Sequence, residues 1–117
     1  KVVTLLGLSF KANTDDIRYS PALDIIRELL SRGIKIQVYD PAAMENVKKF
    51  YPQINYCSSV NEAVQGTDLI VILTEWQEFK DADFGHISET VKNKVIYDTR
   101  YLLIQHNCVP QGYVYVN

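Results

Sequence analysis

The sequence predicts a doubly wound α/β domain, in which a mainly parallel sheet of about six strands carries helices on both faces. Two observations predict this fold class. Short apolar runs rich in β-branched residues recur along the 117 residues, and helical patterns separate them over short connections. A crossover between parallel strands needs such a helix to return the chain. Because 117 residues suit one domain, we expect a single Rossmann-like unit.

The expected strands are six short, nearly continuous apolar runs. Continuous runs of this kind are typical of strands that are covered on both faces. They are Val2–Leu6, Ile34–Tyr39, Ile54–Tyr56 (a weaker pattern), Leu69–Leu73, Val95–Tyr97 and Tyr113–Val116. Ligands of such sheets bind beyond the carboxyl ends of the strands, so the segments after these runs are the candidates for function.

The first expected helix lies between the first two strands. Its apolar residues have the spacing of one buried stripe, and they are Ala22, Ile25, Ile26, Leu29 and Leu30. Ser20 can cap the helix, with Pro21 at the first helical position. Gly33 suits the left-handed residue that closes a helix, so both ends are marked.

Three weaker helical patterns follow. One begins at Asp40-Pro41. The next begins at Ser59, which forms a capping box with Glu62, and ends at Gly66. The last precedes the strand at Val95. The apolar positions expected to face inward are Ala43, Val47 and Phe50 in the first of these helices and Phe84, Ile87 and Val91 in the last.

Composition excludes several classes of protein. With 47% apolar and 22% charged residues the chain is neither disordered, collagen-like nor a coiled coil. Its 12 basic and 14 acidic residues give no electrostatic case for binding nucleic acid or an anionic membrane. No apolar run approaches the length of a membrane-spanning helix and no signal peptide opens the chain, so we expect a cytoplasmic protein.

The cysteines and the first residue carry two further expectations. Cys57 and Cys108 have neither CxxC spacing nor a matched histidine, so we expect two buried thiols, with no metal site and no disulfide. An apolar run begins directly after Lys1, with no initiator Met. We therefore expect the chain to be a piece of a longer protein.

The connection after the first strand is the strongest candidate for a functional loop. It runs from Gly7 to Tyr19, whereas connections typically have ~4–6 residues. It lacks both GxGxxG and GxxxxGK[ST], so neither a standard dinucleotide site nor a P-loop is indicated. Lys11 and Arg18 could hold a phosphate or a carboxylate. Alternatively, a carboxylate of Asp15-Asp16 pairs with Arg18 and holds the loop together.

Three other strand ends carry candidates, each with a structural alternative. Asp40 could bind a ribose diol, but an Asp-Pro before helical residues favours an N-cap. Trp76 could stack on a base or sugar, or close the core under a helix. Arg100 is a second candidate anion contact, or one partner of a surface ion pair. The sequence leaves the roles of Trp76 and Arg100 open.

Several strings, taken in order, closely resemble the C-terminal domain of the UDP-glucose/GDP-mannose dehydrogenase family. Their order and spacing cover essentially the whole chain, and together they are specific for this family. They are Gly7-Leu8-Ser9-Phe10-Lys11-Ala12-Asn13-Thr14-Asp15-Asp16-Ile17-Arg18, Ser20-Pro21-Ala22, Tyr39-Asp40-Pro41, Thr74-Glu75-Trp76 and Asp98-Thr99-Arg100.

The resemblance implies part of an NAD-dependent enzyme of polysaccharide biosynthesis, which oxidises the C6 alcohol of a nucleotide sugar to a carboxylate in two hydride transfers. In this family the catalytic Cys lies upstream, so residues 1–117 would be the UDP-sugar-binding domain, without the NAD-binding and central domains, catalytic residues or activity of its own. The expected reaction is UDP-glucose to UDP-glucuronate, in a homo-oligomer. The alternatives are a GDP-mannose or UDP-N-acetylhexosamine dehydrogenase, or a non-catalytic binding or assembly module.

The resemblance also implies roles for individual residues. Phe10 and Lys11 would contact the nucleotide sugar, and Arg18 would reach the NAD bound mainly by the N-terminal domain. For Arg18 the resemblance therefore favours a ligand contact over a pairing with Asp15 or Asp16 that only holds the loop together. Arg100 would contact the substrate. Thr99 stands where the family string has Gly, and in some members the contact falls on the next position, here Tyr101.

Overall fold

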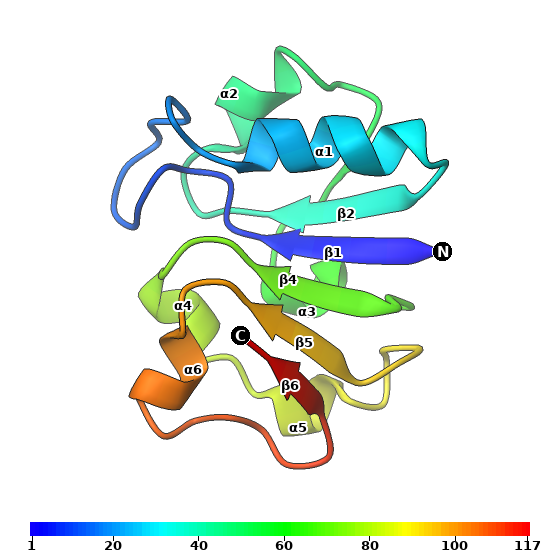
Figure 1. The fold of residues 1–117 in the computed structure, drawn as a ribbon, viewed down its shortest axis with the longest axis vertical. Helices are drawn as coiled ribbons and strands as arrows, with labels where there is room; N and C mark the ends of the chain where they lie inside the picture. The colour runs from blue at the N-terminus through cyan, green and yellow to red at the C-terminus, as the bar shows by residue number, and fades with distance from the viewer.

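A single six-stranded sheet organises the protein, whose computed structural model describes all of residues 1–117 (Figure 1). The strands are β1 (Val2–Leu6), β2 (Lys35–Tyr39), β3 (Asn55–Tyr56), β4 (Leu69–Ile72), β5 (Val95–Asp98) and β6 (Val114–Val116). Every strand pair is parallel, in the order β3-β2-β1-β4-β5-β6. This is the strand order of the Rossmann fold, so the predicted fold class is confirmed.

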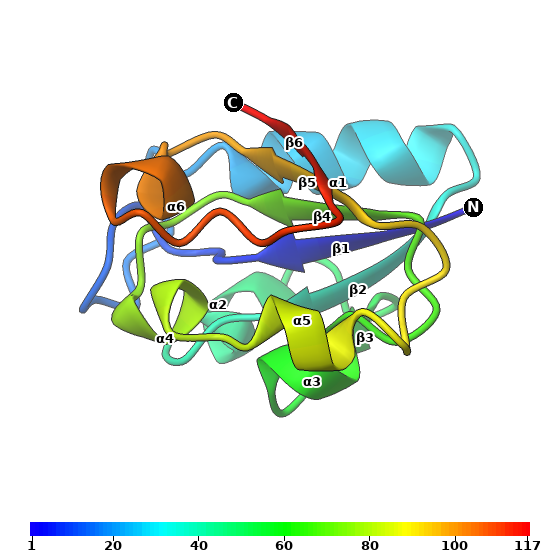
Figure 2. The same cartoon turned by 90° about the horizontal axis from the view of Figure 1, so that it is seen from below.

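Six helices cover the sheet on its two faces. They are α1 (Ala22–Ser31), α2 (Met44–Lys48), α3 (Val60–Ala63), α4 (Gln77–Lys80), α5 (Phe84–Ile87) and α6 (Leu102–Gln105). The buried residues of α1 and α2 belong to one core cluster, and those of α3 to α6 belong to the other. Figure 2 shows α1 on one side of the sheet and α3 and α5 on the other.

The central strand β1 divides the core into these two layers. Val3 and Leu5 pack in the layer under α1, while Leu6 packs in the opposite layer. Thr4 points to that opposite side as well, and its buried hydroxyl donates a hydrogen bond of 2.6 Å to the carbonyl of Ala63 in α3. A polar residue is tolerated there because its hydroxyl has an acceptor.

Both ends of α1 and the start of α3 lie at or within one residue of their predicted positions, whereas α3 ends at Ala63 rather than at Gly66 and α2 begins at Met44 rather than at Asp40-Pro41. The Ser20 hydroxyl accepts a hydrogen bond from the backbone N–H of Ala22 at 3.1 Å, and Gly33 has φ +71°. Ser59 accepts from the backbone N–H of Glu62, also at 3.1 Å. These side chains satisfy N–H groups that the first turn leaves without an intrahelical partner.

The helices α2 and α5 are shorter than their apolar patterns suggest, and the sequence did not predict α4 and α6. The expectation that Phe50 faces inward is wrong: α2 ends at Lys48, and Phe50, beyond it, is 63% exposed. Val91 likewise lies beyond the end of α5, where it packs half-buried against the core. The sequence pattern missed α4 and α6 because a single turn contains no repeat of the helical period.

The expectation that all strands are covered on both faces is wrong for β5 and β6. Tyr97, Val114 and Val116 are 44%, 61% and 48% exposed. Both helices of the α1 layer lie within the β1-to-β3 half of the chain, and every later helix packs in the opposite layer. One face of β5 and β6 is therefore left without a helix.

Candidate functional site

Asp40 fastens the loop after β1 to the carboxyl end of β2. Its carboxylate is fully buried. One oxygen accepts hydrogen bonds from the backbone N–H groups of Leu8 at 2.7 Å and Ser9 at 3.1 Å. The other accepts from Ala42 and Ala43, both at 2.8 Å. These four bonds support the capping interpretation of Asp40 rather than the ribose-binding one.

Ser9 joins the same loop to the segment after β4. Its carbonyl accepts a hydrogen bond of 3.0 Å from the Thr74 hydroxyl, and its own hydroxyl accepts one of 3.2 Å from Trp76 Nε1. Trp76 is half-buried and packs against the core, so it has the structural role that the sequence left open. Gly7 makes the close approach possible, because it has φ +101° and a Cβ there would lie 2.4 Å from Thr74 Oγ1.

The loop is closed at its base and open at its tip. The Ser20 hydroxyl donates to the carbonyl of Leu8 at 2.8 Å, which brings the two ends together. At the tip, the exposed Phe10 ring packs edge-on against Tyr19, with 6.2 Å between the ring centroids. Lys11 is also exposed, and its ammonium forms no ion pair or hydrogen bond. Phe10 and Lys11 are therefore both accessible to solvent at the tip of the loop.

Arg18 forms the loop tie that the sequence offered as an alternative. Its Nε donates to Asp16 Oδ1 at 3.0 Å and its Nη2 to Asp16 Oδ2 at 2.8 Å. The hydrogen bonds from the Arg18 side chain and backbone lower the pKa of Asp16 to about 2. Arg18 Nη1 has no partner, and the side chain is 80% exposed. One edge of the guanidinium thus holds the loop, while the other faces solvent.

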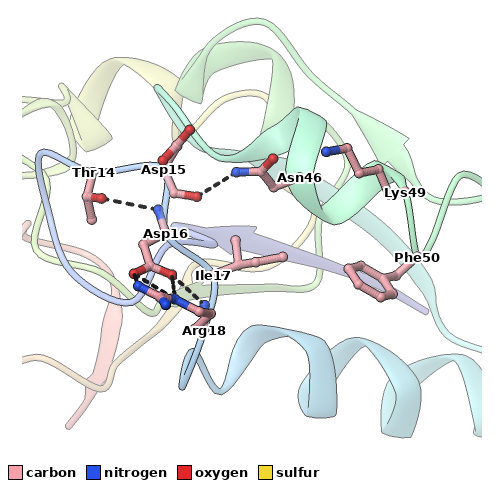
Figure 3. A pocket seen from close by; sticks show the side chains of 8 residues that line it. All are labelled: Thr14, Asp15, Asp16, Ile17, Arg18, Asn46, Lys49 and Phe50. Carbon is pink, nitrogen blue, oxygen red and sulfur yellow. Dashed lines mark hydrogen bonds and ion pairs between the residues drawn. The ribbon is translucent and has the colours of Figure 1, made fainter.

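Arg18 also lines the one hollow in the structure, which has a volume of about 550 Å³ (Figure 3). The lining residues are Thr14, Asp15, Asp16, Ile17, Arg18, Asn46, Lys49 and Phe50. Asn46 of α2 donates a hydrogen bond of 2.8 Å to the carbonyl of Asp15, which fixes one wall to the other. Phe10, Lys11 and Arg100 lie outside this hollow.

Arg100 is held at the carboxyl end of β5 by an ion pair. Its Nε donates a hydrogen bond of 2.8 Å to Glu75 Oε2, and its Nη2 lies 2.6 Å from the same oxygen. Glu75 lies between Thr74 and Trp76, the residues that contact Ser9. The loops after β1, β4 and β5 are therefore joined into one network at the carboxyl edge, which brings together the segments that carry Lys11 and Arg100.

The sequence did not reveal the hydrogen-bonded pair of Asp98 and Tyr115, which supports the loop after β5. Asp98 is fully buried, and its carboxylate accepts hydrogen bonds from the backbone N–H groups of Arg100 at 3.1 Å and Leu103 at 2.8 Å. The Tyr115 hydroxyl donates to the same carboxylate at 2.7 Å. Burial, reinforced by this bond to Asp98, raises the pKa of Tyr115 to about 12. Asp40 and Asp98, both buried acids at strand ends, thus play similar parts in the fold.

Neither cysteine has the surroundings of a nucleophile. Burial raises the pKa of Cys57 to about 11, and it also raises the pKa of Cys108. Both thiols are free and favour the protonated form, whereas reactive cysteines are thiolates near positive charge. Cys108 is half-buried rather than buried as expected, because it follows α6 near the surface.

No group of three or more His, Cys, Asp or Glu residues is placed to hold a metal ion. None of the helices combines the length and the apolar character needed to cross a membrane.

A family model for the UDP binding domain of the UDP-glucose/GDP-mannose dehydrogenase family matches residues 4–105. The chain belongs to this family. It is 43% identical over 103 residues to a UDP-glucose 6-dehydrogenase from Rickettsia typhi, an alignment that covers 86% of this chain and 24% of the relative. The family resemblance stated from the sequence motifs is thereby confirmed.

Solved structures of the family share the fold. The match to a UDP-glucose dehydrogenase from Pyrobaculum islandicum has a TM-score of 0.80 at 29% identity and covers 99% of this chain and 24% of that one. The match to the UDP-N-acetyl-mannosamine dehydrogenase Cap5O from Staphylococcus aureus has a TM-score of 0.77 at 31% identity and covers 99% and 26%. This family member thus spans about a quarter of the length of its relatives, and they differ in the sugar that their names specify.

Proposed function

We propose that residues 1–117 form the UDP-sugar-binding C-terminal domain of an NAD-dependent 6-dehydrogenase that converts UDP-glucose to UDP-glucuronate. The match of residues 4–105 to the family's UDP binding domain carries this proposal, and the relative in Rickettsia typhi is named for UDP-glucose. In this proposal the NAD-binding and central domains, with the nucleophile, belong to the rest of a longer cytoplasmic enzyme of polysaccharide biosynthesis, which works as a homo-oligomer.

The loop tip after β1 supplies the first proposed contacts with the substrate. The unpaired ammonium of Lys11 is suited to a phosphate or sugar hydroxyl, because charge-assisted hydrogen bonds are the strongest of their kind. The exposed ring of Phe10 offers an apolar surface beside it. Since the base of the loop is fixed by Asp40 and Ser9, these two side chains are held at the carboxyl edge, where Rossmann folds bind ligands.

Arg100 supplies the proposed second cation. Glu75 holds its Nε and Nη2, which leaves Nη1 for an anionic group of the substrate. Tyr101, the next residue, is exposed with φ +56° and stands beside the same site. Left-handed backbone at a non-glycine residue is concentrated at functional sites, which is consistent with a ligand contact in this turn.

Only one residue of this chain, Arg18, is suited to contact NAD. The chain has no GxGxxG turn after β1, where Gly7 instead packs against Thr74, so the main dinucleotide site has to lie in the rest of the enzyme. Arg18 fits a phosphate of that cofactor, because its guanidinium is exposed beside the hollow and its Nη1 is free. Bound NAD would supply the hydride acceptor for the sugar alcohol, and this chain would contribute binding and orientation.

Calorimetric titration of the 117-residue chain with UDP, UDP-glucose and GDP tests the proposal. We expect UDP and UDP-glucose to bind and GDP to bind more weakly. Lys11→Ala should weaken UDP binding, whereas Lys35→Ala, an exposed lysine at the amino end of β2, should not. Tighter binding of GDP would favour a GDP-mannose dehydrogenase. Failure of the folded chain to bind any of the three would favour an assembly module.

An activity assay tests the division of the enzyme between domains. The isolated chain should not reduce NAD with UDP-glucose, because the proposed nucleophile and main NAD site lie elsewhere. Turnover by the purified 117-residue chain would overturn this assignment.

A further inference from the structure

The uncovered face of β5 and β6 carries a continuous apolar patch, formed by Val95, Tyr97, Val114 and Val116 and called here the open sheet face. Residues two apart on a strand point to the same face. In the parallel register, Val95 lies beside Val114 and Tyr97 beside Val116. The last three of these side chains are among the large apolar residues that the fold leaves exposed. They adjoin one another rather than being scattered.

The same face of the sheet is covered one strand away. Val71 of β4 lies beside Tyr97 in the register, yet Val71 is buried in the core layer under α1. Figure 1 shows no helix crossing in front of β5 and β6. Wholly parallel sheets occur almost only with both faces covered. The open sheet face is therefore the part of the α1 layer that no helix of residues 1–117 covers.

We propose that an amphipathic helix from the part of the full-length chain outside residues 1–117 packs on the open sheet face. The family relatives are about four times as long as this chain, which spans 24% to 27% of them. A segment of the same polypeptide meets the patch in an intramolecular event, so it does not depend on the concentration of a separate partner. A helix suits the site because helices are what covers parallel sheets, and α1 already covers the adjacent strands.

A second copy of the chain suits the open sheet face less well. A stable dimer buries about 800 Å² on each partner. Three valines and one tyrosine, all of them already partly covered, offer much less, since even a tyrosine buries only about 150–250 Å² when fully enclosed. A single helix laid beside α1 matches the width of two short strands.

A photo-crosslinker at Tyr97 identifies what covers the patch. In the full-length protein, Tyr97→p-benzoylphenylalanine should, on irradiation, cross-link to a peptide outside residues 1–117 of the same chain and run as a monomer on a denaturing gel. A cross-linked dimer would assign the face to a second copy and overturn the proposal. Absence of any cross-linked peptide would overturn it as well.

Thiol labelling provides a second measurement that does not depend on photochemistry. In the full-length protein Val116→Cys should react with a soluble maleimide at least tenfold more slowly than Ser31→Cys, an exposed position at the last residue of α1. Peptide mass spectrometry separates these sites from Cys57 and Cys108. Equal rates would show that the face is open to solvent. Neither measurement uses a nucleotide, so failure is distinguishable from failure of the proposed function.

Discussion

Replacing Asp40 with asparagine should destabilise the protein strongly although it changes one atom. Each carboxylate oxygen of Asp40 accepts two backbone N–H groups. An amide has only one oxygen, and its NH₂ group is a donor. In either orientation of Asp40→Asn, a donor faces two N–H groups, which are those of Leu8 and Ser9 or those of Ala42 and Ala43.

The size of the effect follows from the two bonds that are lost. A buried donor without a partner costs ~1–3 kcal/mol, so two cost about 2–6 kcal/mol. Domains of this kind have a net stability of ~5–15 kcal/mol, so the loss is a large share. For a chain of this size ~1 kcal/mol corresponds to about 4 °C in Tm, and we expect Asp40→Asn to lower the Tm by about 8–24 °C.

Thermal unfolding followed by circular dichroism measures this directly, with Asp15→Asn as the matched control. Asp15 lies in the same loop, is exposed, and uses only its backbone carbonyl in a hydrogen bond. Its substitution should change the Tm by less than about 2 °C, as surface changes usually do. A Tm for Asp40→Asn within about 3 °C of the parent would refute the claim that this carboxylate secures the loop.

Three further variants test the proposed ligand contacts and the packing at the base of the loop after β1. Lys11→Ala in the full-length enzyme should raise the substrate KM roughly tenfold to a hundredfold, from a lost charge-assisted bond of ~1.5–3 kcal/mol; a raised KM for NAD alone would contradict the proposed contact. Arg18→Lys should raise the KM for NAD with little change in Tm, since Lys keeps the charge but has no second N–H edge for the cofactor once it pairs with Asp16, and this exposed pair contributes little to stability; an unchanged KM would mean that Arg18 serves only to hold the loop. Gly7→Ala should cost about 3 kcal/mol or more through strain and contact with Thr74, whereas Gly33→Ala, with open space at its Cβ, should cost only about 1 kcal/mol; equal losses in denaturant unfolding would show that the contact is unimportant.

Strands and helices were predicted correctly where several residues repeat a pattern. Buried strands and the ten-residue α1 have runs or periodicity long enough to read, and Ser20 and Gly33 mark the helix ends through local chemistry alone. The helices predicted to include Phe50 and Val91 end earlier than expected, because spacing shows which residues could share a face but not where a short helix stops. Val91 still packs against the core as predicted, whereas Phe50 is exposed. The uncovered face of β5 and β6 could not be predicted from the sequence either, because the apolar run Val95–Tyr97 looks the same whether or not a helix covers it.

The candidate site was predictable only where its contacts are local. The pairing of Arg18 with Asp16 spans two residues, so the sequence could offer it as an alternative. The pairing of Arg100 with Glu75 joins residues 25 apart, and it depends on β4 and β5 being neighbours. The roles of Phe10, Lys11, Arg18 and Arg100 toward ligands came from the family resemblance and remain predictions.

The fastening of the β1–α1 loop at its base has a consequence for ligand affinity. A loop that is ordered only on binding loses conformational freedom at that moment, and the loss weakens the complex. Here the backbone on both sides of the tip is already fixed by hydrogen bonds of Asp40, Thr74 and Ser20. Ordering of this segment therefore belongs to the folding transition, and a ligand has little more to restrain than the side chains of Phe10 and Lys11.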